Sequence, residues 1–130
     1  MNNKNLVIYP AIFSPEGKNY NVTFPDIPEA ITFGIGIDEA VEMAQSALGL
    51  AIYSEDSYPK ATNPKNITLK RKDDFILMIM LDLGEYRRKN HSKSVRKNTS
   101  IPEWLNVIAE KENINFSQTL TEALKEKLGV

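Results

Sequence analysis

Three polar side chains at alternate positions, Arg96, Asn98 and Ser100, could read nucleic-acid bases. On a β-strand, alternate residues share one face, so these three side chains would point the same way. An arginine can form two hydrogen bonds with guanine O6 and N7, and an asparagine can form two with adenine N6 and N7. The spacing therefore fits base readout if a strand runs through residues 95–101; the alternative is an ordinary polar strand face.

Carboxylates in the first 84 residues could do a second kind of chemistry, because clustered carboxylates hold divalent metal ions in nucleases. The candidates are Asp26, Glu29, Asp38, Glu39, Asp73, Asp74 and Asp82. They are spread over turns, a helix start and a strand start, and no spacing suggests a shared cluster. The single histidine, His91, lies among charged residues, where a surface position is expected. We therefore predict no catalytic residue, no metal site, no cofactor and no enzyme. A metal-dependent nuclease stays an alternative that a Mg²⁺- or Mn²⁺-dependent cleavage assay would test.

Length and composition limit the architecture. A chain of 130 residues with 42% apolar composition can form one modest core, or a compact domain of roughly 80 residues plus a small module that dimerises. The absence of cysteine excludes disulfides, cysteine-bound zinc and thiol nucleophiles, and suits a reducing cytoplasm. No apolar run reaches the ~20 residues of a membrane span, and the polar N-terminus does not resemble a signal peptide. We expect a cytoplasmic protein without a membrane partner.

Charge is distributed unevenly along the chain. Residues 1–84 carry seven basic and eleven acidic side chains, whereas residues 85–130 carry nine basic and six acidic ones. Six of the basic residues follow one another closely with no acid between them: Arg87, Arg88, Lys89, Lys93, Arg96 and Lys97. This pattern indicates an acidic domain joined to a basic one, although such a run can also be a solvated linker.

The N-terminal part has the pattern of a small α+β domain. Apolar alternation and turn residues predict strands over 6–13, 20–24 and 30–34, a helix over 38–53 with Asp38 as its N-cap, a loop to Pro64, a weak strand over 66–70 and a strong strand over 75–83. The last strand is apolar on both faces, so it should be central or shielded by a partner. The order β-β-β-α-β-β predicts a sheet with the helix on one face.

The C-terminal part predicts a strand followed by two helices. Residues 84–92 have the composition of a linker, and 95–101 have that of a short strand. A helix is then expected from Pro102 to near Asn113, and a second from Ser117 as N-cap to a stop at Gly129.

About 36 residues of this kind cannot form a stable core alone, so a second copy must complete it. Two strands would pair antiparallel as a ribbon, with one face on four helices and the other free to enter a DNA major groove. The expected dimer core comprises Val95, Ile101, Leu105, Ile108, Leu120 and Leu124.

Two segments carry a resemblance to a known family. Residues 95–105, Val-Arg-Lys-Asn-Thr-Ser-Ile-Pro-Glu-Trp-Leu, with 114–118, Ile-Asn-Phe-Ser-Gln, resemble the C-terminal ribbon-helix-helix of HicB-type antitoxins and, more broadly, the Arc/MetJ repressor class. Residues 20–34 and the helix at 38–40 resemble the degraded, partial RNase H-like domain of the same family. Together the two matches cover most of the chain, and their order is more specific than either one.

The resemblance implies a division of labour: a toxin-binding domain at 1–84, a basic linker at 85–92, and a DNA-binding and dimerisation domain at 93–130. Counting back from Ile101 as inward, Arg96, Asn98 and Ser100 would face DNA. The phosphate contacts would come from Lys93, Lys97 and the backbone at the helix start at Ser117. The same phase turns Lys97 inward, so either its side chain extends out at the ribbon's end or the register is shifted by one residue.

The family resemblance also implies a partner, a HicA-type toxin that is an mRNA-cleaving ribonuclease. An acidic domain suits a basic RNA-cleaving protein, since complementary charge speeds association. Candidate contacts are Glu29, Ile31, Phe33, Glu55 and Asp56. The implied function is an antitoxin that occludes its toxin and represses its own operator in double-stranded DNA as a homodimer. The alternative is a stand-alone repressor whose N-terminal domain senses a ligand or protein; whether dimers pair into tetramers is left open.

Overall fold

The computed structural model describes residues 5–130 and divides them into two compact units. We call the described residues up to Ser92 the N-terminal unit and Lys93–Val130 the C-terminal unit. The fold is α+β, with a four-stranded antiparallel sheet and four α-helices among the described residues. No helix in residues 5–130 has the length and apolar character needed to cross a membrane.

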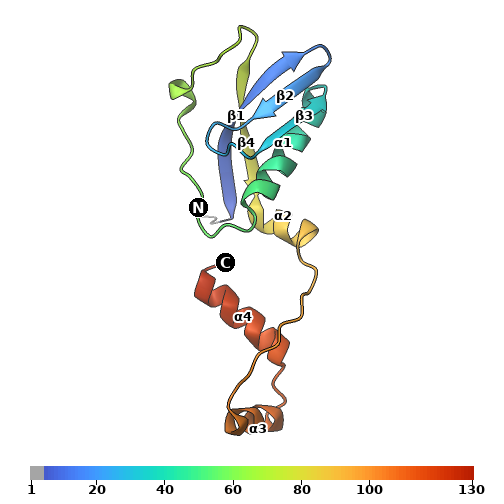
Figure 1. Cartoon of the computed structure of the whole chain (residues 1–130), viewed down its shortest axis with the longest axis vertical. Helices are drawn as coiled ribbons and strands as arrows, with labels where there is room; N and C mark the ends of the chain where they lie inside the picture. Colours follow the sequence, from blue (N-terminus) through green and yellow to red (C-terminus); the bar gives the residue numbers. More distant parts are fainter. Residues whose placement is uncertain (1–4) are drawn as a thin grey trace. The chain divides into compact units, whose positions relative to one another are not determined.

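The N-terminal unit contains the whole sheet. Its elements are β1 (Leu6–Glu16), β2 (Asn19–Thr23), β3 (Ile31–Ile35), α1 (Ile37–Ile52), the short 3₁₀ helix η1 (Pro64–Asn66), β4 (Phe75–Asp82) and α2 (Leu83–Asn90). The strand order is β3-β2-β1-β4, and every neighbouring pair is antiparallel. Helix α1 lies across one face of this sheet (Figure 1).

The core lies between α1 and that face. Alternate β1 residues from Val7 to Phe13 are buried, and their partners on β4 include the buried Ile79. Phe13 stacks on Phe75, its cross-strand partner, with ring centroids 5.6 Å apart. From α1, the buried residues are Ala40, Ala44, Leu48, Gly49 and Ile52, which recur at three- and four-residue intervals. The amphipathic helix predicted over 38–53 is confirmed.

The opposite side of the sheet, which we call the open face, carries the other set of alternating residues. Cross-strand pairing brings Ile8 beside Met80, Pro10 beside Met78, and Asn21 beside Phe33. Several of its large apolar side chains are exposed: Leu6, Ile8, Ile31, Phe33, Ile35, Met78 and Met80. A sheet that is apolar on both faces is typical of a sheet covered on both sides.

One prediction about the strands is wrong, and one of the two alternatives for the strongly apolar strand is excluded. Residues 66–70 form no strand, because Asn66 ends η1 and residues 67–70 continue the connection to β4. The N-cap of η1, Asn63, accepts a hydrogen bond from the Lys65 N–H. The strongly apolar strand β4 is not central but lies at one edge of the sheet. Met78 and Met80 on β4 are therefore exposed in the single chain. The remaining interpretation of the apolar pattern is that a partner shields this strand.

The linker predicted at 85–92 is also wrong for most of its length, because Leu83–Asn90 form helix α2. Asp82 caps the helix by accepting a hydrogen bond from the Glu85 N–H at 3.1 Å. Leu83 is buried, and the Arg87 Nε donates to the Tyr53 carbonyl at 2.9 Å. The helix is thus held by packing and capping, which its charged composition does not reveal.

Helix α1 starts one residue earlier than predicted. Its N-cap is Gly36, whose φ of 83° lies in the left-handed region, and not Asp38, which lies in the first turn. Glu39, in the first turn, accepts a hydrogen bond from the Ile35 N–H at the end of β3, which ties the helix start to the preceding strand.

Gly49 leaves room for the ring of Tyr86. A Cβ atom at this position would lie 2.6 Å from Tyr86 Cδ2 and Cε2. We expect Gly49→Ala to lower the free energy of unfolding by about 1–2 kcal/mol, because the close approach to three Tyr86 ring atoms puts the overpacking cost at ~2–3 kcal/mol, against a helix-propensity gain of ~1 kcal/mol. Urea denaturation followed by circular dichroism measures the change. Ser46→Ala, at an exposed position of the same helix, is the control; an equally stable or more stable Gly49→Ala protein would contradict this account.

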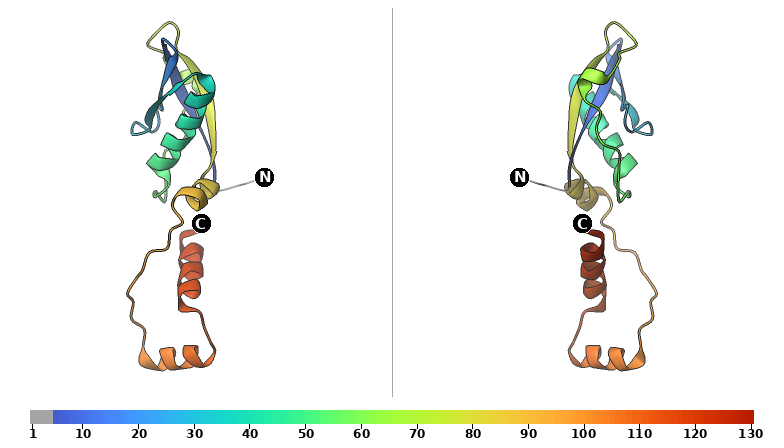
Figure 2. Two further views of the ribbon diagram at one scale, coloured as in Figure 1. Left: turned by 90° about the vertical axis from the view of Figure 1, so that its right-hand side faces the viewer. Right: turned by 90° about the vertical axis from the view of Figure 1, so that its left-hand side faces the viewer.

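The C-terminal unit consists of an extended segment and two helices. Residues 93–102 run without helix or strand into α3 (Glu103–Lys111), and a short turn leads to α4 (Phe116–Leu128) (Figure 2). Asn113 has a φ of 55° and Gly129 a φ of 72°, the left-handed conformation that is common just after a helix, and the two helices end close to these residues as predicted. The cap of α4 is not Ser117 but Asn115, whose side chain accepts a hydrogen bond from the Gln118 N–H at 3.0 Å.

Candidate nucleic-acid interface

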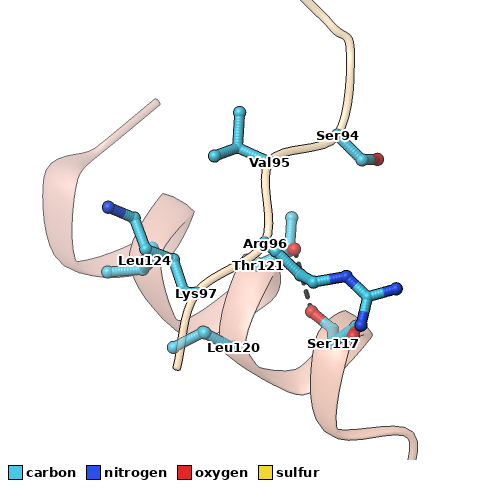
Figure 3. A pocket seen from close by; sticks show the side chains of 8 residues that line it. All are labelled: Ser94, Val95, Arg96, Lys97, Ser117, Leu120, Thr121 and Leu124. Carbon is cyan, nitrogen blue, oxygen red and sulfur yellow. Dashed lines mark hydrogen bonds between the residues drawn. The ribbon is translucent and has the colours of Figure 1, made fainter. Parts of the chain in front are cut away.

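A groove of about 880 Å³ separates the extended segment of the C-terminal unit from α4. Its lining residues are Ser94, Val95, Arg96, Lys97, Ser117, Leu120, Thr121 and Leu124 (Figure 3). The Arg96 guanidinium extends in the direction of Ser117, in the first turn of α4 (Figure 3). The Thr121 hydroxyl donates to the Ser117 carbonyl at 2.9 Å, which ties the first two turns of α4 together.

Four consecutive residues, 94–97, line this groove, so the segment does not alternate there as a pleated strand would. Further along, Thr99 and Ile101 line a second hollow of about 200 Å³ with Asn106 and Phe116, whereas Asn98 and Ser100 line neither hollow and are exposed. A strand needs a neighbour for its backbone hydrogen bonds. The base-reading roles of Arg96, Asn98 and Ser100 and the register around Lys97 therefore stay predictions.

The apolar side chains of the C-terminal unit are all at least partly open to solvent. None of residues 93–130 is buried. The six residues expected in the dimer core are exposed by between 39% at Leu120 and 77% at Val95. They lie on the extended segment (Val95 and Ile101), on α3 (Leu105 and Ile108) and on α4 (Leu120 and Leu124). Two short helices with no buried residue cannot supply the hydrophobic stabilisation that a folded unit needs.

The six clustered basic residues are divided between the two units. Arg87, Arg88 and Lys89 form the last turn of α2, and Lys93, Arg96 and Lys97 belong to the C-terminal unit. Two of the α2 residues have local partners: Arg87 bonds the Tyr53 carbonyl, and the Lys89 ammonium lies 2.9 Å from the Glu85 carboxylate. The expected nonspecific attraction to phosphate therefore rests mainly on the residues of the C-terminal unit.

The five candidate toxin contacts fall at two places in the N-terminal unit. Glu29 and Glu55 line a hollow of about 340 Å³ with Asp26, beside the end of α1. The Asp26 carboxylate accepts hydrogen bonds from the Thr62 N–H and hydroxyl. Ile31 and Phe33 lie on the open face instead, and Asp56 is exposed in the loop after α1. The structure thus separates an acidic hollow from an apolar strand.

Neither the carboxylates nor the histidine form a cluster that could bind a metal ion in the described residues. The His91 ring stacks on Tyr53 at a centroid distance of 3.7 Å, and its Nε2 lies 3.4 Å from the Tyr86 hydroxyl. Burial, followed by the neighbouring Tyr53, raises the pKa of Tyr86, so this hydroxyl stays protonated. His91 is thus exposed, as expected, and its ring packs on Tyr53 at the end of α2.

Sequence reasoning assigned no site role to five residues of these hollows: Ser94, Thr99, Asn106, Phe116 and Thr121. A signal existed for Thr121, because it follows Ser117 by four residues and so shares its helix face. Asn115 was also detectable as a cap, since it stands three residues before Gln118. Its side chain accepts a hydrogen bond from the Gln118 N–H.

Comparisons with known proteins agree with the fold. The sequence matches no protein-family model. It is 48% identical over 50 residues to Antitoxin HicB 2 of Photorhabdus laumondii, which is 37% of this chain and 36% of that protein. It is 50% identical over 52 residues to Antitoxin HicB 1 of the same organism, which is 38% of this chain and 34% of that protein. The alignments thus span about a third of the length of these curated relatives.

Solved structures match over nearly the whole chain. A chain of a toxin–antitoxin complex from Streptococcus pneumoniae has a TM-score of 0.59 and 28% identity, over 94% of this chain and 99% of that one. The antitoxin HicB of Burkholderia pseudomallei, at 23% identity and a TM-score of 0.51 over 94% of this chain and 96% of that one, shares the fold. These comparisons confirm that the chain resembles HicB-type antitoxins, in sequence over those 50 residues and in fold over most of its length.

Proposed function

We propose that this chain is the antitoxin of a type II toxin–antitoxin pair. The N-terminal unit occludes a HicA-type mRNA-cleaving ribonuclease, and the C-terminal unit binds the pair's own operator as a dimer and represses transcription. One observation carries the proposal: none of residues 93–130 is buried, although α3 and α4 carry regularly spaced large apolar residues. A second copy would bury that surface and give the segment at 95–101 a strand partner.

The resulting ribbon-helix-helix dimer would expose a two-stranded ribbon of suitable width for the DNA major groove. Arg96, Asn98 and Ser100 would then contact base edges, and Lys93, Lys97 and the start of α4 at Ser117 would contact phosphates. The acidic excess of residues 1–84 supports the other half of the proposal, because a basic ribonuclease would be attracted to it. The chain of the Streptococcus pneumoniae complex offers a precedent for this fold beside a toxin.

Separation of the two activities tests the proposal. We expect Arg96→Ala and Asn98→Ala to abolish operator-specific binding, because each lost bidentate base contact costs ~1–3 kcal/mol and is lost twice in a dimer. Neutralisation of the toxin should be unchanged. Fluorescence anisotropy with operator and scrambled duplexes measures the first effect, and growth on coexpression with the adjacent small toxic reading frame measures the second.

Lys111→Ala is a matched control, because it removes an exposed basic residue of the same unit at the end of α3, outside the groove. It should retain the preference for operator over scrambled DNA. Loss of neutralisation in Arg96→Ala or Asn98→Ala, with circular dichroism unchanged, would contradict the division between the two units. A neighbouring reading frame that is harmless, or that is not rescued, would exclude the antitoxin function itself.

A further inference from the structure

Positive charge in the first 84 residues is gathered in one segment that the proposed function does not use. Five of the seven basic residues of positions 1–84 lie within positions 60–72, and no acidic residue lies among them. The rest of positions 1–84 therefore holds two basic residues against all eleven acidic ones. We call residues 60–72 the basic segment. Its five basic side chains are all exposed: Lys60, Lys65, Lys70, Arg71 and Lys72.

The basic segment is part of a long connection that is fixed to the domain. Residues 53–74 join α1 to β4, and the 3₁₀ helix η1 is the only regular element in them (Figure 1). The Thr62 N–H and hydroxyl donate to the Asp26 carboxylate, and Arg71 Nη1 donates to Ser14 Oγ at 3.4 Å. Connections longer than ~12–15 residues in a compact domain are usually either functional or disordered, and these contacts hold this one in place.

The basic side chains of the segment have no acidic partner in the chain. None of the five forms an ion pair with a carboxylate of residues 5–130, where the one ion pair found joins Lys89 to Glu85. Asp26, which contacts the segment, bonds Thr62 instead. Exposed like charges repel one another, so a partner that supplies several negative charges at regular spacing would stabilise them. Double-stranded DNA is such a partner, with one charge per ~1.7 Å of helix axis.

The surroundings of the segment favour DNA over other anionic partners. A basic toxin would be repelled from this surface and attracted to the acidic parts of the unit. A membrane surface binds basic segments firmly when apolar side chains insert beside them, and Leu69 is the only exposed large apolar residue of the basic segment. Duplex DNA is also the polyanion that the proposed operator binding already brings to the chain.

We propose that the basic segment binds the phosphate backbone of duplex DNA beside the operator. The inference rests on the proposed function, because the C-terminal dimer must bind the operator first. Two basic segments are then tethered to the same duplex, so contacts that are weak alone act at a high effective concentration. Lysine contacts to phosphate carry no sequence information, so the segment adds affinity and salt dependence to operator binding but no specificity.

Binding to duplexes of two lengths tests the proposal. The core duplex is the shortest fragment of the DNA upstream of the reading frame that the full chain binds in preference to scrambled DNA. The long duplex adds about 20 base pairs of scrambled sequence on each side, room for several phosphate contacts. Fluorescence anisotropy should show that the long duplex binds at least ~10-fold more tightly at low salt. Its log–log salt slope should be steeper by ~3–4 if about four phosphates are neutralised.

A pair of charge-matched variants isolates the segment. Lys70→Ser combined with Lys72→Ser should remove most of the gain from the flanks and leave the affinity for the core duplex unchanged. Arg71 is retained because it contacts Ser14. The control, Met43→Glu combined with Ser46→Glu, lowers the net charge by the same amount at two exposed positions of α1 and should keep the gain. Circular dichroism verifies that both proteins are folded.

Three results would overturn the role of the basic segment. The first is equal affinity of the chain for both duplexes, and the second is an equal loss of the gain in the control, which would assign the effect to net charge. The third is a larger gain from single-stranded flanks of the same length, which would make single-stranded nucleic acid the ligand. Failure of the proposed function is distinguishable: no upstream fragment would then be preferred over scrambled DNA, and the inference would fall with it.

Discussion

Truncation of Leu120 or Leu124 to alanine is expected to weaken the C-terminal dimer by about 2–5 kcal/mol if both side chains become buried in it. Because each ~1.4 kcal/mol is a factor of ten, the dissociation constant of that interface would rise roughly 30- to 4,000-fold. Both residues line the groove between the extended segment and α4, and both are partly exposed in the single chain. Their expected cost therefore comes from the partner and not from contacts within one chain.

The only tryptophan of the chain makes this measurement specific. Trp104 lies in α3, so its fluorescence reports the C-terminal unit during urea denaturation. For a dimer, the midpoint should rise with protein concentration, and Leu120→Ala or Leu124→Ala should lower it at every concentration. Leu50→Ala on α1 should leave the Trp104 transition unchanged. A midpoint that does not depend on concentration would show that the C-terminal unit is stable without a partner.

Local sequence rules predicted much of the C-terminal unit because they act within a few residues. Helix periodicity and the helix ends near Asn113 and at Gly129 need no distant contact, and both are found. The cap of α4 was misplaced at Ser117 because asparagine and serine are equally good caps, and two candidates stood two residues apart. The strand at 95–101 depends on a second chain, so neither the sequence nor a single chain determines its register.

The N-terminal unit shows where sequence rules fail. The β1, β2, β3 and α1 regions were predicted, because alternation and helix periodicity are strong there. Helix α2 was taken for a linker because most of its residues are charged or polar. The residues that attach it to the domain are Leu83, Tyr86 and Arg87, and their partners are distant in sequence. The apolar pattern of β4 suggested a strand that is either central or shielded by a partner, and the strand lies at the sheet edge. Apolar residues on both faces of a strand indicate that both faces are packed against other residues. They do not show whether those residues belong to the same chain.

Gly34→Ala should cause the largest loss of stability in the N-terminal unit, even though its sequence context gives no warning. Gly34 lies in β3 on the face that packs against the start of α1. A Cβ atom there would lie 2.4 Å from the backbone nitrogen of Ala40 and 2.5 Å from its Cα. Backbone atoms cannot rotate away as a side chain can, so the strand and helix must separate. We expect the free energy of unfolding of this unit to fall by about 3 kcal/mol or more.

Gly17→Ala provides the comparison that isolates this clash from the general effect of replacing a glycine. Gly17 has a φ of 62°, and a Cβ atom added to it would meet no heavy atom within 4 Å, so alanine there costs only the ~1–2 kcal/mol of a left-handed residue. Far-UV circular dichroism during urea denaturation should therefore rank Gly34→Ala below Gly17→Ala. The Trp104 transition should change in neither variant if the two units fold independently. A Gly34→Ala protein as stable as Gly17→Ala would contradict this account. It would mean that α1 does not approach β3 closely enough for a Cβ atom at position 34 to clash with Ala40.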